Sequence, residues 1–463
     1  MPKSEKIVSR SATELVRLIR SRDVSVSEVI EASLQRIAEI NPQLNAFTAV
    51  YEQEARDAAR RADAAVRTDA PLGPLHGIPI ALKDMTPIRG KVTTSGSRAL
   101  ATHVADRDSW IVTALRKSGA IIVGKTTMPE FAYSSFTQSP LFGITRNPWD
   151  PLRTPGGSSG GSAVAVASGA VPLAEGTDMG GSVRIPAALC GVVGFKPSLG
   201  RIPFDLLPST FDNISHFGPL ARCCHDAALF VAATQGPDDC DIQSVPPSFG
   251  YDGSLHIEPR SLRLALSLDF GFYAIDPDVE RNVLSIVDRL KQRGVVVEAV
   301  DLKWSSRIID VWMDYWRVFM AAYFEEVYEK DPALLDPAVR QLIEQGRQLD
   351  AVRYKRLDIE RTQFWNGLRG ILGRFDALIT PTTAIAAPLA TQSDRDFGWA
   401  DERGRYHGLD MTAPFNLFGQ CPALSVPSGC TASGLPTGLQ VIGRRYRDLE
   451  ALQIGALVES ASA

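Results

Sequence analysis

The sequence predicts an α/β fold, in which helices cover a large β-sheet. A helical pattern at 109–118 stops at Gly119, and the apolar run AIIVGK follows at once. A helix with a glycine cap that leads directly into a β-branched strand is the repeating step of such a fold. Short apolar runs cut by glycine and proline, such as GIPIALKD at 77–84, recur from about residue 72. Strand-like runs then return near the C-terminus as FDALITPT and CPALSVPSG.

The first segment, residues 1–71, is expected to be helical. Ser11 and Thr13 are candidate N-caps of one helix. Ser25 is the candidate cap of a second helix, which we expect to end at 41–42, an Asn-Pro pair. The apolar residues that share one face of this second helix are Val26, Ile30, Leu34 and Ile37.

The remaining chain divides by pattern into three parts. Residues 72–240 are the predicted α/β core, residues 241–375 a mostly helical insertion or cap, and residues 376–463 a C-terminal part that completes the sheet. Because strand patterns return after the insertion, we expect it to interrupt one sheet, so that 1–463 is a single domain. No internal repeat or low-complexity linker is present in the sequence.

Composition argues against several classes of protein. The chain has 463 residues, 44% of them hydrophobic, and its 49 basic and 53 acidic residues give a formal net charge of −4. This balance lacks the basic footprint of a nucleic-acid-binding protein. Six cysteines without a CxxC pair indicate neither a disulfide scaffold nor a zinc site, so we expect reduced thiols and a cytoplasmic location. The charged N-terminus and the absence of a long apolar run predict a soluble, unprocessed protein without a membrane segment.

The glycine-serine segment TPGGSSGGSAVAVASG at 154–169 admits three interpretations. A linker would have this composition, but here the segment runs directly into a small-residue helix pattern. A phosphate loop of the Walker type requires a lysine after its last glycine, where this chain has Ser162 and Ala163. The third interpretation is a loop whose glycines allow close backbone approach, with Ser158 and Ser159 at its tip. Such a loop can present a catalytic serine.

A second glycine-serine loop, GTDMGGSVRIPA at 176–187, places Ser182 after two glycines. It is not a G-x-S-x-G elbow, and no histidine stands in a Ser-His-Asp order. We expect each of the six to be structural: His76, His103, His216, His225, His256 and His407. A serine nucleophile then needs another base, and a lysine serves if burial lowers its pKa toward neutrality. Lys83 ends the apolar run GIPIAL and is the candidate; the alternative is a structural pair with Asp84.

These segments resemble those of the amidase signature enzymes, which use a Ser-cis-Ser-Lys triad. GIPIALKD is similar to the lysine strand of that family, TPGGSSGGSAVAVASG to its glycine-serine loop, and GTDMGGSVRIPAALCGVVGFKPSLGR to its nucleophile segment. Further similar segments are TTSGS, GKTTMPEF, FGPLAR, FDALITPT and GLPTGLQVIG, so that only about 245–370 has no counterpart. The resemblance implies a single large mixed β-sheet with helices on both faces.

The resemblance also implies roles for individual residues. Ser182 would be the nucleophile, Lys83 the base, and Ser158 the bridging serine after a cis peptide bond from Gly157. Four backbone amides would form the oxyanion hole, those of Met179, Gly180, Gly181 and Ser182. The implied reaction is hydrolysis of an amide C–N bond through an acyl-enzyme on Ser182, with no metal or cofactor. Related esters and carbamates (urethanes) would also be substrates.

Supporting residues and partners follow from the same comparison of patterns. Ser159 stands beside the bridging serine, and Asp178 and Arg184 could pair across the nucleophile turn; the alternative for both charged residues is ordinary solvation. We expect a small-molecule amide, ester or carbamate and water as the partners, no nucleic acid or membrane, and a monomer or homodimer.

Two positions depart from the common pattern of the family. Met179 stands where threonine or isoleucine is usual, and Glu175 where a small or apolar residue is typical. The alternative function is the amidase-like glutaminase subunit of a glutamyl-tRNA amidotransferase complex, and a catalytically inactive binding protein is a third. Amidotransferase subunits usually carry glutamine after the arginine of the nucleophile loop, where this chain has Ile185.

The insertion contains aromatic residues at helical spacing, namely Trp312, Tyr315, Trp316, Phe319 and Tyr323. Such a stripe either packs in the core or lines a binding cleft, and the sequence leaves both open. A cleft lined by this stripe would favour a bulky apolar or aryl group on the substrate over glutamine or malonamide.

Overall fold

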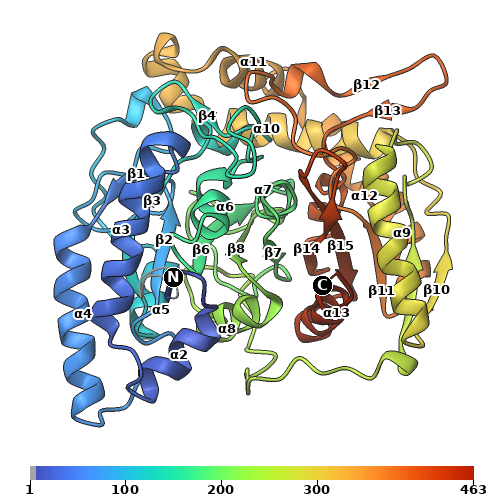
Figure 1. Cartoon of the computed structure of the whole chain (residues 1–463). Helices are drawn as coiled ribbons and strands as arrows, with labels where there is room; N and C mark the ends of the chain where they lie inside the picture. The colour runs from blue at the N-terminus through green and yellow to red at the C-terminus, as the bar shows by residue number, and fades with distance from the viewer. Residues whose placement is uncertain (1–6, 463) are drawn as a thin grey trace.

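The computed structural model describes residues 7–462. The first six residues, which belong to the charged N-terminus discussed above, lie outside the described residues. Within the described part, an eleven-stranded sheet crosses the middle of the molecule (Figure 1). In spatial order its strands are β1 (Phe47–Val50), β3 (Ile121–Thr126), β2 (Pro79–Lys83), β6 (Leu173–Asp178), β8 (His216–Ala221), β7 (Val193–Lys196), β14 (Ala423–Cys430), β15 (Pro436–Gly443), β11 (Ala377–Pro381), β9 (Arg263–Leu266) and β10 (Val296–Ala299).

The sheet is mixed, as predicted. Strand β2 runs parallel to both of its neighbours, β3 and β6, whereas the pairs from β6 through β8, β7, β14 and β15 to β11 are all antiparallel. Two short strand pairs lie outside this sheet: β4 (Gln138–Ser139) with β5 (Gly143–Ile144), and β12 (Trp399–Ala400) with β13 (Tyr406–His407).

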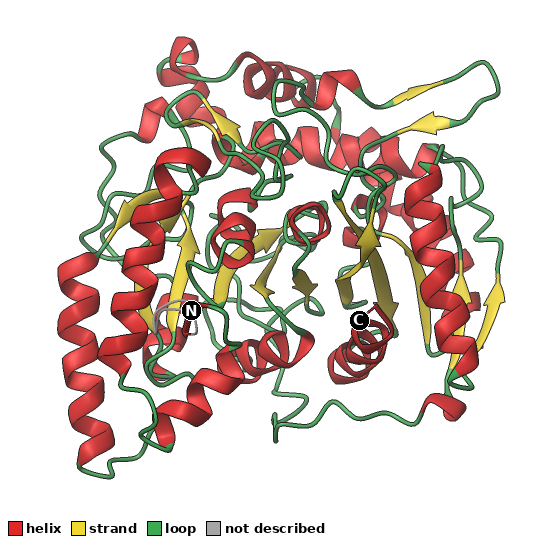
Figure 2. Ribbon diagram, viewed as in Figure 1, coloured by secondary structure: helices red, strands yellow, loops and turns green. Residues whose placement is uncertain are grey.

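Helices cover both faces of the sheet (Figure 2). The described helices are α2 (Ala12–Arg20), α3 (Val26–Leu44), α4 (Glu52–Arg67), α5 (Trp110–Lys117), α6 (Gly160–Ala167), α7 (Arg184–Cys190), α8 (Cys224–Thr234), α9 (Pro277–Gln292), α10 (Arg307–Lys330), α11 (Pro337–Gly346), α12 (Ala351–Leu372) and α13 (Asp448–Ser462). On the central strands, α6 and α7 pack from one side, and α8 and α13 from the other. Adjacent positions of β14 show these two layers: Leu424 contacts α13, and Ser425 lies on the side of α7.

Local signals in the sequence predict several elements correctly. Ser11 caps α2 with a capping box, and Ser25 caps α3 in the same way. The predicted helix at 109–118 is α5, and β3 follows it directly. The predicted end of the second helix is wrong: α3 continues through Pro42 to Leu44 and ends at Asn45, which has left-handed backbone angles.

The 241–375 insertion is mostly helical, but it also adds β9 and β10 to one edge of the sheet. Its helices α10 and α11 lie across the top of Figure 1, over α6 and α7. Strands β11, β14 and β15 from the C-terminal part join the same sheet as β2 and β6. Segments far apart in sequence therefore meet above the central strands.

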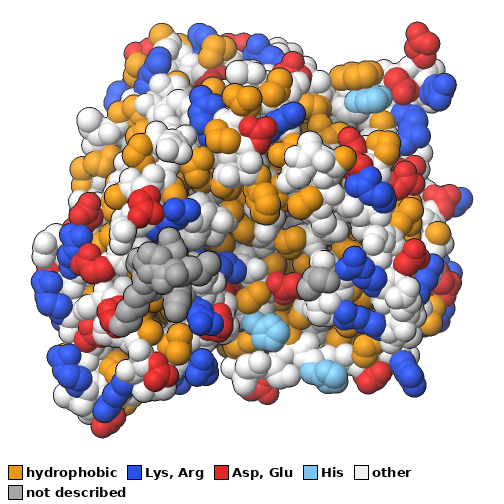
Figure 3. Space-filling view, viewed as in Figure 1, with side chains coloured by type: hydrophobic (Ala, Val, Ile, Leu, Met, Phe, Trp, Pro, Cys, Tyr) orange, Lys and Arg blue, Asp and Glu red, His pale blue; other side chains and the backbone are white. Residues whose placement is uncertain are grey.

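The surface carries both signs of charge. Basic and acidic side chains are interspersed over the face seen in Figure 3. No helix among residues 7–462 is long and apolar enough to cross a membrane.

Candidate active site

Lys83 is the last residue of β2, and its side chain is fully buried. All five residues of this strand are buried, because β2 lies between β3 and β6 inside the sheet. The Lys83 amine donates hydrogen bonds to Oγ of Ser158 (2.6 Å) and to Oγ1 of Thr177 (2.9 Å). The structure thus brings together two of the predicted catalytic residues, which are 75 positions apart in sequence.

The environment of Lys83 favours its neutral form. Burial lowers the pKa of Lys83 from that of an ordinary lysine to about 7, although the negative charges of Glu175 and Asp178 oppose this effect. Only an unprotonated amine can accept a proton, so a pKa near neutrality suits a general base that works near pH 7.

The alternative role for Lys83, a structural pair with Asp84, is wrong. Asp84 instead pairs with Lys125, whose Nζ lies 3.4 Å from its Oδ1. The strand register explains this choice: Leu82 is paired with Lys125, and side chains alternate between the faces of a sheet. Asp84 and Lys125 therefore share one face, while Lys83 points to the other.

Ser158 lies at the tip of the glycine-serine loop, and α6 begins two residues later. The peptide bond between Gly157 and Ser158 is cis, so this prediction is confirmed. A Cβ atom on Gly157 would lie 2.7 Å from the carbonyl oxygen of Ser134, so only glycine fits there. The linker interpretation is excluded, because Ser158 and Ser159 are fully buried and the N–H of Ser159 donates to the carbonyl of Ser182 (3.0 Å). This bond joins the two glycine-serine loops.

Ser182 lies in the turn between β6 and α7, and it is partly exposed, whereas Gly181 and Val183 are buried. The two glycines before it are required by close contacts. A Cβ atom on Gly180 would come within 2.3 Å of the Trp312 ring, and one on Gly181, where φ is +123°, within 1.8 Å of the Thr412 hydroxyl. The turn is therefore held closely from both sides, with Ser182 at its open edge.

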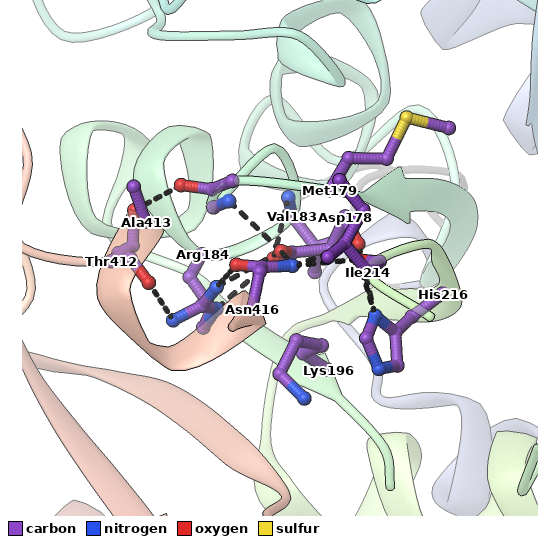
Figure 4. A network of polar contacts seen from close by, with 12 residues as sticks. Asp178, Met179, Val183, Arg184, Lys196, Ile214, His216, Thr412, Ala413 and Asn416 are labelled. Atoms are coloured by element: carbon purple, nitrogen blue, oxygen red, sulfur yellow. Dashed lines mark hydrogen bonds and ion pairs between the residues drawn. The ribbon is translucent and has the colours of Figure 1, made fainter. Parts of the chain in front are cut away.

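The predicted pair between Asp178 and Arg184 is present and fully buried (Figure 4). The guanidinium contacts both carboxylate oxygens, through Nε to Oδ2 (3.0 Å) and Nη2 to Oδ1 (2.9 Å). The Asn416 amide adds a bond to Oδ1 (2.9 Å). Burial alone raises the pKa of Asp178, but the Arg184 charge and these hydrogen bonds bring it below its ordinary value. Asp178 is therefore a fixed carboxylate that braces the turn, and the solvation alternative is wrong.

Asp178 also engages one of the predicted oxyanion donors. The N–H of Gly181 donates to Asp178 Oδ1 (2.9 Å), and that of Val183 donates to Oδ2 (3.2 Å). In this state the Gly181 amide holds the turn in shape. Met179, Gly180 and Ser182 supply the other three predicted amides.

His216 and His76, the alternative candidates for the base, do not contact Ser158 or Ser182. Burial lowers the pKa of His216 to about 3, so its ring is neutral, and its nitrogens lie against the carbonyls of Asp178, Ile214 and Gly419. His76 contacts the carbonyl of Ala62. Within residues 7–462, no group of three or more His, Cys, Asp or Glu side chains is arranged to hold a metal ion.

A cavity of about 430 Å³ lies against Ser182. Its apolar lining includes Met179, Ile185, Tyr273, Trp312, Trp316, Phe397 and Leu409. Charged side chains also border it, namely Asp310, Arg317, Asp394, Arg395 and Asp410. A cavity of this size, apolar with a few polar groups and open to a serine, is typical of a site for a small organic molecule.

The aromatic stripe of the insertion divides between two places. Trp312 and Trp316 stack with their ring centroids 5.8 Å apart, and both line the cavity. The indole N–H of Trp312 donates to the carbonyl of Met179 (3.0 Å), which joins α10 to the nucleophile turn. Phe319 and Tyr323 instead line a separate hollow of about 230 Å³. The two tryptophans of the stripe thus line the cleft.

Sequence patterns do not place Thr177 or Glu175 beside Lys83, although Glu175 stands out as a departure from the family pattern. Thr177 accepts a hydrogen bond from its amine, and the Glu175 carboxylate accepts one from its main-chain N–H (2.9 Å). A signal was present: these residues alternate on a strand just before the nucleophile turn, so they share a face. The sequence does not indicate that β6 lies directly beside β2.

Comparison with known proteins identifies the family of this chain. The model of the Amidase family matches residues 28–452. The chain is 35% identical to an acylamidase of Rhodococcus erythropolis, over 97% of this chain and 95% of that protein. A glutamyl-tRNA(Gln) amidotransferase protein of Symbiobacterium thermophilum, one subunit of that enzyme, is also 35% identical, over 96% of this chain and 95% of that one.

Solved structures give the same result. A bacterial aryl acylamidase of the amidase signature family superposes with a TM-score of 0.91 at 30% identity, covering 98% of this chain and 96% of that one. This match over nearly the whole chain agrees with the observed fold, a mixed sheet with helices on both faces. The chain therefore belongs to the amidase signature family.

Proposed function

We propose that the protein is a serine hydrolase that cleaves amide C–N bonds through an acyl-enzyme on Ser182, with Ser158 and Lys83 as the other members of a Ser-cis-Ser-Lys triad. The observation that carries this proposal is the 2.6 Å hydrogen bond between the buried Lys83 amine and Ser158. Because burial lowers the pKa of Lys83 to about 7, this amine is able to accept a proton near neutral pH.

The proposed relay consists of two proton transfers. Neutral Lys83 takes the proton of Ser158, and Ser158 takes the proton of Ser182, whose Oγ forms a bond to the acyl carbon. The same relay, run in reverse, gives the proton to the departing amine as the C–N bond breaks. Water then attacks the acyl-enzyme by the same route, releases the acid and restores Ser182. None of these steps requires a metal or a cofactor.

We propose that the amides of Met179, Gly180 and Ser182 stabilise the oxyanion, while the Gly181 amide keeps the turn in shape through Asp178. Glycine at 180 is needed because Trp312 lies against it. A donor in an oxyanion hole typically lowers the barrier by about 3–4 kcal/mol.

The cavity favours substrates with a bulky apolar or aryl group. Trp312 and Trp316 form a flat apolar wall, and Ile185 contributes to the lining next to Ser182. The similar aryl acylamidase supports anilides as the first class to test. Activated esters and carbamates are further proposed substrates, because the serine attacks any sufficiently activated carbonyl. We propose a cytoplasmic monomer or homodimer.

Sequence identity does not distinguish the proposed hydrolase from the glutaminase alternative, because the acylamidase and the amidotransferase protein are both 35% identical to this chain. The apolar part of the cavity lining supports the hydrolase over this alternative. The position after Arg184 carries the apolar side chain of Ile185, which faces the cavity. Such a wall suits an aryl group better than the carboxamide and charges of glutamine.

A substrate panel tests the proposal. Anilides, primary amides, esters, carbamates and glutamine are offered to the wild type and to Ser182→Ala, with circular dichroism to confirm folding. We expect anilide hydrolysis by the wild type and its loss in the variant. Near wild-type activity in Ser182→Ala contradicts the proposed nucleophile. Preferred turnover of glutamine, or co-purification with a second protein of such a complex, supports the alternative.

A further inference from the structure

Glu175 is a buried carboxylate beside the base. It lies on β6 with no exposed surface, and Oε2 accepts hydrogen bonds from the main-chain N–H of Lys83 (2.9 Å) and the hydroxyl of Thr86 (3.1 Å). Its other oxygen, Oε1, has no hydrogen-bond partner among the described residues. A carboxylate left half satisfied in the interior is costly, so its position requires an explanation.

The strand pairing explains the contact with Lys83. The ladder between β2 and β6 pairs Ile80 with Leu173 and Ala81 with Ala174, and it stops there. Beyond this point the N–H of Lys83 has no strand partner on the β6 side, and the Glu175 side chain takes that place. Glu175 therefore fixes the end of the strand that carries the base.

The charges around this pair are few and mostly neutralised by their own partners. On β6, Asp178 is bound by Arg184 of α7, and on β3, Lys125 is paired with Asp84. Strand β8 presents Pro219 opposite Glu175, and α6 carries no ionisable side chain. Glu175 is thus the carboxylate near Lys83 that no cation contacts directly.

We propose that Glu175 is a positioning residue for Lys83: its carboxylate holds the main chain of the base and keeps the buried amine basic enough to take the Ser158 proton. This inference rests on the proposed function, in which Lys83 is the base.

The electrostatic effects support this role. Burial lowers the pKa of Lys83, and the negative charge of Glu175 raises it again. Burial conversely raises the pKa of Glu175 well above its ordinary value, and the bond from the Lys83 N–H and the Lys83 charge oppose this rise only in part. A fully buried lysine without a nearby anion can have a pKa as low as about 5–6. Such an amine is mostly neutral at pH 7 but is a weak proton acceptor.

The test is the pH dependence of Glu175→Gln, which keeps an oxygen for both hydrogen bonds and removes the charge. We expect the rising limb of kcat/KM for an anilide to move to lower pH by about one unit, with a plateau lower by a few-fold. The rate at which phenylmethanesulfonyl fluoride modifies Ser182 should move in the same direction, which gives a readout without turnover. Glu175→Asp keeps the charge and should move the limb less.

Thr86→Val provides a second variant if Glu175→Gln folds poorly. It removes one hydrogen bond that stabilises the Glu175 anion, so a smaller shift to lower pH is expected. Ser162→Ala is the matched control. The only part of Glu175 that the Ser162 hydroxyl contacts is the main-chain carbonyl (2.8 Å). The limb of this variant should therefore stay in place.

The inference is overturned if the limb of the folded variant, Glu175→Gln or Thr86→Val, stays in place or moves to higher pH. The proposed function fails on a different result, namely persistence of the limb in Lys83→Met.

Discussion

Lys83 on β2 and Lys125 on β3 are neighbouring buried lysines with different partners. Both are fully buried, and burial lowers the pKa of each. Lys125 is paired with the Asp84 carboxylate (3.4 Å) and donates to the hydroxyl of Thr93 (2.5 Å). Lys83 points to the other face, where its amine contacts the hydroxyls of Ser158 and Thr177.

The difference shows what distinguishes a base from a structural cation. Burial is common to both, so burial alone does not identify the base. A directly paired carboxylate favours the charged form of Lys125, whereas the hydroxyls around Lys83 leave its neutral form accessible. The carboxylate of Glu175 contacts the Lys83 main chain and influences the amine from a distance.

The largest expected effect is a difference in activity between variants of the two lysines. Lys83→Met should lower kcat/KM by about 10²–10⁴-fold with the fold retained, because a general base is lost. Lys125→Met should keep activity within a few-fold for each folded molecule. Anilide kinetics normalised to folded protein provide the measurement. Equal losses in both variants would remove the distinction between the lysines.

A second experiment compares the same variants by stability. Lys125→Met leaves Asp84 buried without its cation, which should cost about 3 kcal/mol or more in the free energy of unfolding. Adding Asp84→Asn to Lys125→Met removes the unpaired charge and should recover part of this loss. Urea unfolding measures both changes. A fully stable Lys125→Met would mean that the pair with Asp84 contributes little.

The pH dependence sharpens the comparison further. The active form of Lys83 is neutral and its pKa is lowered to about 7, so kcat/KM should rise with pH through neutrality to a plateau near pH ~8–9. Lys125→Met should keep this limb, and Lys83→Met should lose it. If Lys83→Met retained the limb, a group other than Lys83 would have to be the base.

The smallest expected effect is the extra loss in a double variant. Lys83 and Ser158 act in one relay, so Lys83→Met combined with Ser158→Ala should be within a few-fold of the worse single variant. Kinetics of the three variants on one anilide provide the measurement. Losses that multiply would indicate independent roles for the two residues.

Much of the fold and of the site follows from local patterns. The run GIPIAL indicates that Lys83 is carried into the interior, and the glycines before Ser182 indicate a tight turn. The same kind of signal precedes Lys125 in AIIVGK. Sequence patterns predict burial of both lysines equally, and only the register of β2 and β3 separates their roles.

Other features depend on contacts between distant segments. From the sequence Glu175 is an unexplained departure, because nothing local shows that its side chain binds the Lys83 N–H where the ladder between β2 and β6 ends. The sequence does not show whether the aromatic stripe packs in the core or lines the cleft, because its residues have different surroundings. Trp312 lies over the nucleophile turn, whereas Tyr323, on the same helix, borders a separate hollow. The contact between Trp312 and Met179 joins residues 133 positions apart, and periodicity does not record packing over such a separation.

The central claim is that Ser182, activated through Ser158 and Lys83, takes up the acyl group. The most direct measurement is rapid mixing with an activated ester or anilide, followed by mass spectrometry of the quenched enzyme and its peptides. We expect a burst of alcohol or amine equal to the active-site concentration, with the added acyl mass on Ser182. An acyl group on Ser158, Ser159 or a cysteine, or multiple turnovers by Ser182→Ala, would contradict the account.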